Sequence, residues 1–128
     1  MATILLDSSV IFDALNNKPG RPAYLNAILE EGNLLGCCPV NVTETYAGLR
    51  DHEAVRTLRF LRSLEFFPVT FDDARAAGLL KRHWGAKGHT LSYADATIAA
   101  VAIANDLALM TDNRKHYPMP ELTLYPLS

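Results

Sequence analysis

The stretch TILLDSSVIFDAL, residues 3–15, joins a short apolar run to a longer periodic segment through a single acid. Residues 3–6 carry β-branched and aliphatic side chains, which predicts a short buried strand over residues 3–7. The pattern of residues 8–15 predicts a helix, so Asp7 stands where the strand ends and the helix begins. A carboxylate at that point risks partial burial beside a hydrophobic core. If it were alone, it would be explained as the N-cap of the helix or as a turn residue.

The rest of the chain repeats this order of strand and helix. Short apolar runs predict further strands at residues 34–38, 65–69, 107–111 and 123–126. The longer segments between them predict helices at residues 22–31, 41–50, 52–64, 71–84 and 92–105. This alternation favours an α/β fold, a three-layer α/β/α sandwich with a mostly parallel five-stranded sheet. No repeat or linker divides the sequence, so residues 1–128 are predicted to form one domain.

The composition limits the classes of protein that are possible. The sequence contains 49% hydrophobic and 20% charged residues, which excludes a disordered acidic tail. The net charge of −2 means that any site for a polyanion has to be local. No apolar run approaches the roughly 20 residues of a membrane span and no signal-peptide pattern is found, so we expect a cytoplasmic protein without membrane contact. The adjacent Cys37 and Cys38 have the wrong spacing for a zinc site or a disulfide, and we interpret them as buried core residues.

Asp7 has a counterpart late in the chain. Asp112 follows the strand predicted at residues 107–111 in the same way. The carboxyl ends of parallel strands meet at one edge of the sheet, where α/β proteins also bind their ligands. We therefore expect both carboxylates at this edge.

Two more acids lie at the starts of predicted helices. Glu44 comes three residues after Asn41, and Asp95 comes three residues after Ser92, so each acid also fits a capping box. Helices of α/β units begin near the same sheet edge, and four carboxylates there repel one another unless a cation lies among them. Oxygen ligands of this type predict Mg²⁺ or Mn²⁺ rather than zinc. An ion held in this way can promote hydrolysis of a phosphodiester, which makes a nuclease the natural hypothesis.

The segments around these acids resemble the PIN-domain ribonucleases, and most closely the VapC-type toxins of bacterial toxin–antitoxin modules. The resemblance is carried by four segments in the family's order, LLDSSVIFDAL, VTETYAGL, LSYADATIAAVAIAN and LALMTDNRKHYP. It implies a parallel-sheet α/β/α sandwich and an endoribonuclease that depends on Mg²⁺ or Mn²⁺ and acts on tRNA or other structured RNA. It further implies a small cognate antitoxin as a partner and a homodimer.

The resemblance also assigns roles to individual residues. The candidate catalytic and metal-binding residues are Asp7, Glu44, Asp95 and Asp112, with Asn113 as the alternative at the fourth position. Ser9 matches a small hydroxyl residue after the first acid, and it either hydrogen-bonds a carboxylate or metal-bound water or serves as an N-cap. Attack by a metal-bound water would leave a 3′-hydroxyl and a 5′-phosphate, because an external water does not need the 2′-hydroxyl.

Basic residues in two places are candidates for RNA contact. Arg114, Lys115 and His116 lie beside the predicted acid edge, and we favour them for contact with the RNA backbone. A second basic cluster, either a solvated helix face or a phosphate contact, consists of Lys81, Arg82, Lys87 and His89. Trp84 and Tyr93 nearby can stack on an exposed base, but their spacing favours a place in the core or an interface.

Two other functions fit parts of the sequence. A receiver-like signalling domain also gathers acids around Mg²⁺, but it needs an Asp at the end of the third strand and a Lys at the end of a later one. The segments PVTFDD and LMTDNRK do not supply these residues. A non-catalytic PIN-like interaction domain would keep the fold and bind a partner through its surface. The complete set of acids favours the enzyme.

Overall fold

A parallel four-stranded sheet forms the centre of the computed structural model, which describes residues 1–127. The strands lie in the order β3-β2-β1-β4, and they are β1 (Thr3–Leu6), β2 (Leu34–Cys37), β3 (Glu65–Phe66) and β4 (Ala108–Met110). In the register of the two central pairs, Leu5 lies opposite Gly36 on one side and Leu109 on the other. Because all four strands run in the same direction, their carboxyl ends share one edge of the sheet.

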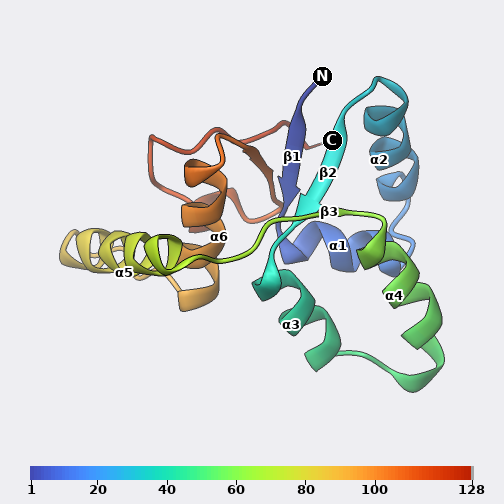
Figure 1. The fold of residues 1–128 in the computed structure, drawn as a ribbon, viewed down its shortest axis with the longest axis horizontal. Coiled ribbons are helices and arrows are strands. Elements are labelled where there is room, and N and C mark those ends of the chain that lie inside the picture. The colour runs from blue at the N-terminus through green and yellow to red at the C-terminus, as the bar shows by residue number, and fades with distance from the viewer. Residues whose placement is uncertain (128) are drawn as a thin grey trace.

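Helices cover both faces of this sheet (Figure 1). One face carries α1 (Ser8–Leu15), α2 (Arg21–Glu30) and α4 (Ala54–Arg62), and the other carries α5 (Phe71–Ala86) and α6 (Tyr93–Ala104). The remaining helices are α3 (Pro39–Ala47) and two short 3-10 helices, Asp51–Glu53 and Arg114–His116. The arrowheads of β1 and β2 point toward α1 and α3, so these helices begin at the carboxyl edge of the sheet (Figure 1). The predicted three-layer α/β/α fold is confirmed.

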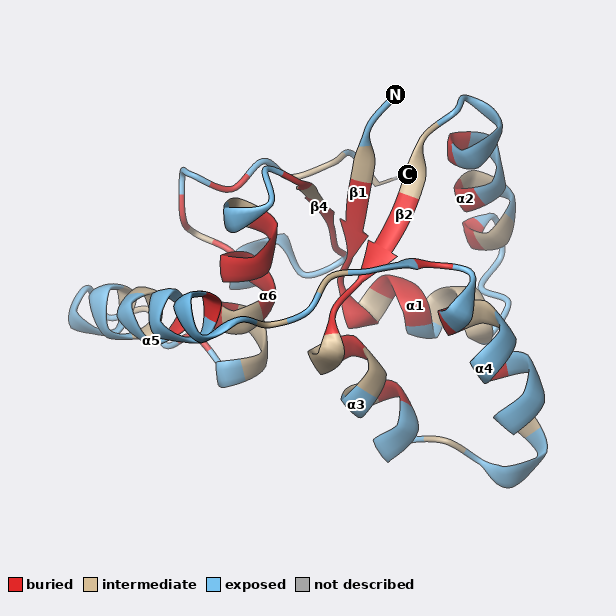
Figure 2. Cartoon of the chain, in the orientation of Figure 1, coloured by how far each residue is buried: buried red, intermediate tan, exposed pale blue. Residues whose placement is uncertain are grey.

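The alternation of side chains along β1 explains why the sheet is buried on both faces. Leu5 packs into the core beneath α5 and α6, whereas Ile4 and Leu6 pack into the core beneath α1, α2 and α4. Helix α6, rich in alanine, is buried along much of its length, and α5 outside it is mostly exposed (Figure 2). The small side chains of α6 allow its backbone to lie close to the sheet.

The two adjacent cysteines point to opposite faces of the sheet. Cys37 belongs to the core beneath α1 and α2, and Cys38 belongs to the core beneath α6. Burial raises the pKa of the Cys37 thiol to about 11, so this thiol stays protonated and unreactive at neutral pH. The prediction that both are core residues is confirmed.

The prediction of a fifth strand is wrong. Among residues 1–127, the segment at 123–126 contributes only a single parallel bridge between Leu124 and Leu109. Its two hydrogen bonds run from the Leu109 N–H to the carbonyl oxygen of Thr123 and from the Tyr125 N–H to that of Leu109, and the next pair would need Thr111, which lies beyond the end of β4. The predicted strand at 65–69 is likewise reduced to two residues. No helix within residues 1–127 combines the length and the apolar character that a membrane crossing requires.

Gly36 in β2 provides a first test of the packing. A Cβ atom there would lie 2.8 Å from Cε2 of Phe67 and 3.2 Å from the carbonyl oxygen of Glu65. We expect Gly36→Ala to lower the free energy of unfolding by about 1 kcal/mol, because overpacking outweighs the smaller entropy of the unfolded chain. Gly78→Ala in α5, where a Cβ meets nothing within 4 Å, should instead raise it by about 0.5–1 kcal/mol. Urea unfolding checks both, and an equally stabilised Gly36→Ala would contradict the packing described.

Candidate active site

Asp7 is buried at the carboxyl end of β1, with 4% of its surface exposed. It occupies the N-cap position of α1, but its side chain makes no capping hydrogen bond. Its Oδ2 atom instead accepts hydrogen bonds from Ser9 Oγ at 2.7 Å and Thr111 Oγ1 at 2.9 Å, and its Oδ1 atom accepts one from the Tyr117 hydroxyl at 2.7 Å. These donors compensate for the burial of the carboxylate. The position of Asp7 is therefore stable without requiring a cation to explain it.

Tyr117 joins Asp7 to a second acid. Its hydroxyl oxygen lies 2.7 Å from Asp7 Oδ1 and 3.2 Å from Asp95 Oδ1. A hydroxyl has one proton, so it donates to one carboxylate at a time. Burial of the ring, followed by the charges of the two carboxylates, raises the pKa of Tyr117 far above its usual value. The hydroxyl consequently remains a donor and holds two acids, from opposite halves of the chain, beside each other.

Asp95 reaches this position from the first turn of α6. Ser92 is the N-cap, and its Oγ accepts a hydrogen bond from the backbone N–H of Asp95 at 3.0 Å, which confirms the predicted cap. The Asp95 carboxylate does not close a capping box. It accepts from Tyr117 through Oδ1, and its Oδ2 lies 3.1 Å from His116 Nδ1. His116, predicted to contact RNA, thus lies directly against a candidate metal ligand.

Glu44 is tied to the same strand end through α1. Ser8 Oγ donates to Glu44 Oε1 at 2.6 Å, and Asn41 Nδ2 donates to Ser8 Oγ at 3.0 Å. The prediction that Asn41 is the N-cap of this helix is wrong, because α3 already begins at Pro39. A proline fits the first helical position well, since its missing N–H would lack a helical partner there. Asn41 is fully buried and accepts from the backbone N–H of Cys38 at 2.8 Å.

Asp112 belongs to a separate cluster of charges. Its Oδ1 atom lies 3.5 Å from Nη2 of Arg21, and Nε of Arg21 lies 3.8 Å from Oδ2 of Asp13. A hydrogen bond with the Asp13 carboxyl, followed by burial, raises the pKa of Asp112. Asn113 beside it donates its backbone N–H to Thr111 Oγ1 at 2.9 Å. The carboxylates of the four predicted acids therefore divide among three sets of partners, although the backbone N–H of Asp112 also donates at 3.3 Å to Ser9 Oγ, a donor to Asp7.

The sequence interpretation missed three residues that organise the site. They are Tyr117, Thr111 and Arg21. Tyr117 stands in the quoted segment LALMTDNRKHYP, but a tyrosine after a basic stretch gives no signal of a partner 110 residues earlier. Arg21 follows the turn signal KPG, which is typical of a surface residue. In the structure, however, only 4% of its surface is exposed. Only the folded chain identifies their partners.

The donor chemistry of the site fits a divalent cation. Within residues 1–127, no three His, Cys, Asp or Glu side chains come together as a group that could hold a metal ion. The pair Asp7 and Asp95 nevertheless places two carboxylate oxygens within 3.2 Å of one phenolic oxygen. Mg²⁺ typically takes one or two protein carboxylates and keeps several waters, so a pair satisfies its usual requirement. Asp7 Oδ1 and both oxygens of Asp95 each take part in only one of the contacts described and so keep a lone pair for a cation, whereas Asp7 Oδ2 already accepts two hydrogen bonds.

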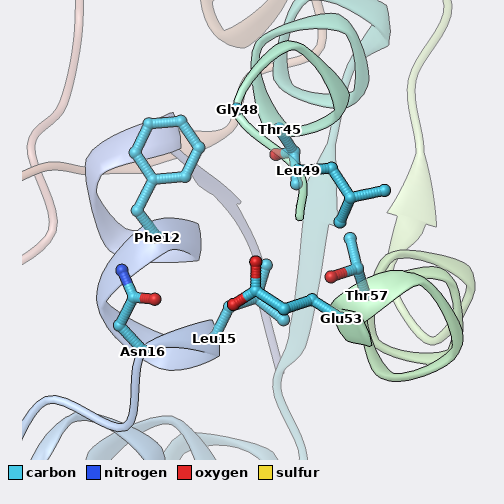
Figure 3. Close-up of a pocket in the computed structure, with 8 residues that line it drawn as sticks. All are labelled: Phe12, Leu15, Asn16, Thr45, Gly48, Leu49, Glu53 and Thr57. Carbon is cyan, nitrogen blue, oxygen red and sulfur yellow. The ribbon is translucent and has the colours of Figure 1, made fainter. Parts of the chain in front are cut away.

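A separate hollow lies between α1, α3 and α4. It has a volume of about 230 Å³, and Figure 3 shows Phe12 and Leu15 of α1 facing Leu49 and Thr57 across it. None of the four predicted acids lines this hollow. The predicted RNA contacts Arg114 and Lys115 lie elsewhere, exposed on the 3-10 helix that precedes Tyr117. The predicted catalytic acids therefore lie outside this hollow, and we place the candidate active site at the acids.

Comparisons with known proteins show the family of the chain. Residues 4–122 match the PIN domain family. The chain is 30% identical over 119 residues to the Mycobacterium tuberculosis protein named Ribonuclease VapC19, covering 92% of this chain and 95% of that protein.

Solved structures share the fold across nearly the whole chain. VapBC2 from Rickettsia felis, solved bound to a promoter DNA fragment, superposes with a TM-score of 0.85 at 20% identity, covering 98% of this chain and 99% of that one. VapBC-5 from Mycobacterium tuberculosis, of the VapBC family of toxin–antitoxin systems, gives a TM-score of 0.67 at 21% identity, covering 99% of this chain and 100% of that one. With sequence, fold and family match in agreement, the chain belongs to the PIN-domain family, among its VapC-type members.

Proposed function

We propose that this chain is an endoribonuclease that depends on Mg²⁺ or Mn²⁺, and that it is the toxin of a toxin–antitoxin pair. The observation that carries the proposal is the contact of Asp7 and Asp95 with one phenol at the carboxyl edge of the sheet. The relative named Ribonuclease VapC19 supports the reaction class, since it matches over almost its full length. Family membership sets aside the receiver-like alternative.

Asp7 and Asp95 would hold the ion, with Glu44, Asp112 and Asn113 as further predicted ligands. When bound, the ion supplies the Lewis acid that polarises the phosphodiester and activates water. Ser9, Thr111 and Tyr117 fix the orientation of the Asp7 carboxylate through their hydroxyl groups.

The basic residues after β4 complete the proposed reaction site. Arg114 and Lys115 are exposed next to the acids, where their charges can bind phosphates of the RNA backbone. His116 is held by Asp95 at 3.1 Å and can donate a hydrogen bond to a phosphate when protonated. Hydrolysis by an external water would give a 3′-hydroxyl and a 5′-phosphate. A structured RNA such as tRNA is the substrate class we propose.

The proposed partners follow from the same relatives. The matched structures are VapBC assemblies, which supports a cognate antitoxin protein as the partner of this chain. A homodimer and a cytoplasmic location, where RNA and antitoxin are both present, are further parts of the proposal.

Cleavage of RNA with and without metal tests the proposal. The purified chain should cut total RNA in Mg²⁺ or Mn²⁺ and stop in EDTA, and Asp95→Asn should cut at least about tenfold more slowly. Asp72→Asn is the matched control, because Asp72 also lies in the first turn of a helix but is exposed on α5. Equal cutting by all variants would indicate a contaminating nuclease. No cutting in either metal would instead favour the non-catalytic interaction domain.

A further inference from the structure

One interval of the sequence contains basic residues and no acid. From residue 74 to residue 94 there is no Asp or Glu, although the chain as a whole has a net charge of −2. The cationic residues in this interval are Arg75, Lys81, Arg82 and Lys87, accompanied by His83 and His89. Most of them lie on the C-terminal half of α5 and on the segment that leads into α6. This part of the surface is therefore suited to a polyanion.

Tyr93 stands at the end of this interval and is not a core residue. It is the first residue of α6, and 78% of its surface is exposed, so of the two expected places, the core or an interface, the core is wrong for this ring. Lys81 Nζ lies 4.7 Å from the centre of the ring and also donates a hydrogen bond to the carbonyl oxygen of Leu91. The lysine thereby fixes the ring from one side. An aromatic ring that is both exposed and held in place is a suitable platform for stacking.

A hollow lies beside this ring. Its volume is about 500 Å³, within the range of about 300–1,000 Å³ that is usual for small-ligand clefts. The residues that matter for binding there are Lys81, Arg82, Thr90 and Tyr93, and no acid is among the lining residues. Gly78 and Gly85 also line it, and a Cβ at either position would meet nothing within 4 Å. The hollow thus combines the aromatic ring of Tyr93 with the cations of Lys81 and Arg82.

Tyr93 lies in the same helical turn as Asp95 of the candidate active site. Tyr93 and Asp95 are the first and third residues of α6, and a helical turn rises only about 5.4 Å. The two side chains leave the helix in different directions, because residues two apart do not share a face. An RNA strand bound near Asp95 through the proposed ion therefore has to cross the N-terminus of α6 to bring a nucleotide over Tyr93.

We propose that Tyr93 stacks an unpaired base of the RNA substrate next to the cleaved bond, while Lys81 orients the ring and Arg82 contacts a phosphate. The inference rests on the proposed ribonuclease function and adds to it the kind of RNA that is bound. Bases within a duplex are stacked on their neighbours and do not offer a face to the protein, so the substrate has to be single-stranded at this position.

Binding of a fluorescein-labelled ten-nucleotide RNA, followed by anisotropy in EDTA, tests the inference without cleavage. Tyr93→Ala should weaken binding by about 5- to 100-fold, the equivalent of one base stacked on an aromatic ring. Tyr93→Phe should bind as the parent does, because the stacking surface is kept. Phe71→Ala is the matched control, since Phe71 is also an exposed aromatic at the first position of a helix. Arg82→Ala should reduce the dependence of log Kd on log salt by about 0.7.

Three results would overturn the inference. They are unchanged binding by Tyr93→Ala, an equal loss on a blunt RNA duplex, or no binding of the single-stranded RNA by the parent. A parallel cleavage assay in Mg²⁺ separates this inference from the proposed function. Cleavage by the parent with unaltered binding by Tyr93→Ala would reject the stacking role alone. Binding that depends on Tyr93 without cleavage in either metal would reject the ribonuclease alone.

Discussion

Replacing Asp7 by asparagine should lower RNA cleavage by at least about 100-fold while the protein stays folded. Asp7 is the most deeply buried of the predicted acids, and it contacts Tyr117, the residue that also holds Asp95. Asparagine has nearly the same shape and can accept the Tyr117 hydrogen bond through its amide oxygen. It removes the negative charge that a cation needs. Circular dichroism should therefore still show a folded protein, although with a lower melting temperature, because an amide nitrogen in place of Oδ2 no longer accepts the hydrogen bonds of Ser9 and Thr111.

The control for this variant is Asp106→Asn. Asp106 lies in the connection between α6 and β4, at the other end of the sheet, and its φ of 55° suits asparagine. Cleavage by this variant should equal that of the parent. A second readout is the rise in melting temperature on addition of Mg²⁺, which binding to the folded state predicts for the parent and for Asp106→Asn but not for Asp7→Asn. Cleavage by Asp7→Asn at the rate of the parent would reject the assigned site.

The sequence could predict those parts of the fold that depend on local patterns. Helix α1 has the predicted boundaries, and the Ser92 cap is present, because both depend on residues within one or two turns. The failure of the fifth strand could not be predicted, since a short apolar run does not reveal that its neighbour β4 ends at Met110. The start of α3 was misjudged because Pro39 at the first helical position outweighed Asn41 as a cap.

The candidate site was predictable in its residue types and less so in its contacts. Parallel strands explain why Asp7 and Asp112 both follow a strand at the same edge. Their separation into different hydrogen-bond partners depends on Tyr117 and Arg21, whose positions are set by packing of remote segments. The spacing of Tyr93 left the core and an interface both open, and only the folded chain excludes the core by exposing the ring. Sequence patterns locate charged groups on elements, and tertiary packing decides which ones touch.

The contact of Tyr117 with two carboxylates should also be measurable as stability. We expect Tyr117→Phe to lower the free energy of unfolding in EDTA by about 2–3 kcal/mol, since a buried donor to charged acceptors is lost. Tyr24→Phe is the matched control, because the Tyr24 hydroxyl donates at 2.6 Å to a neutral and exposed acceptor, the carbonyl oxygen of Pro126. That variant should lose only about 0.5–1 kcal/mol.

Urea unfolding of the two tyrosine variants distinguishes a bridge between acids from an ordinary hydrogen bond. Both variants lose only the hydroxyl group of a tyrosine. The difference between their losses of unfolding free energy therefore reports the hydrogen-bond acceptors rather than the ring. If the two losses were equal, the Tyr117 hydroxyl would not be holding Asp7 and Asp95 together. The larger loss for Tyr117→Phe would mean that this phenol stabilises the acid pair before any ion or RNA binds, so the site would be organised in advance of its ligands.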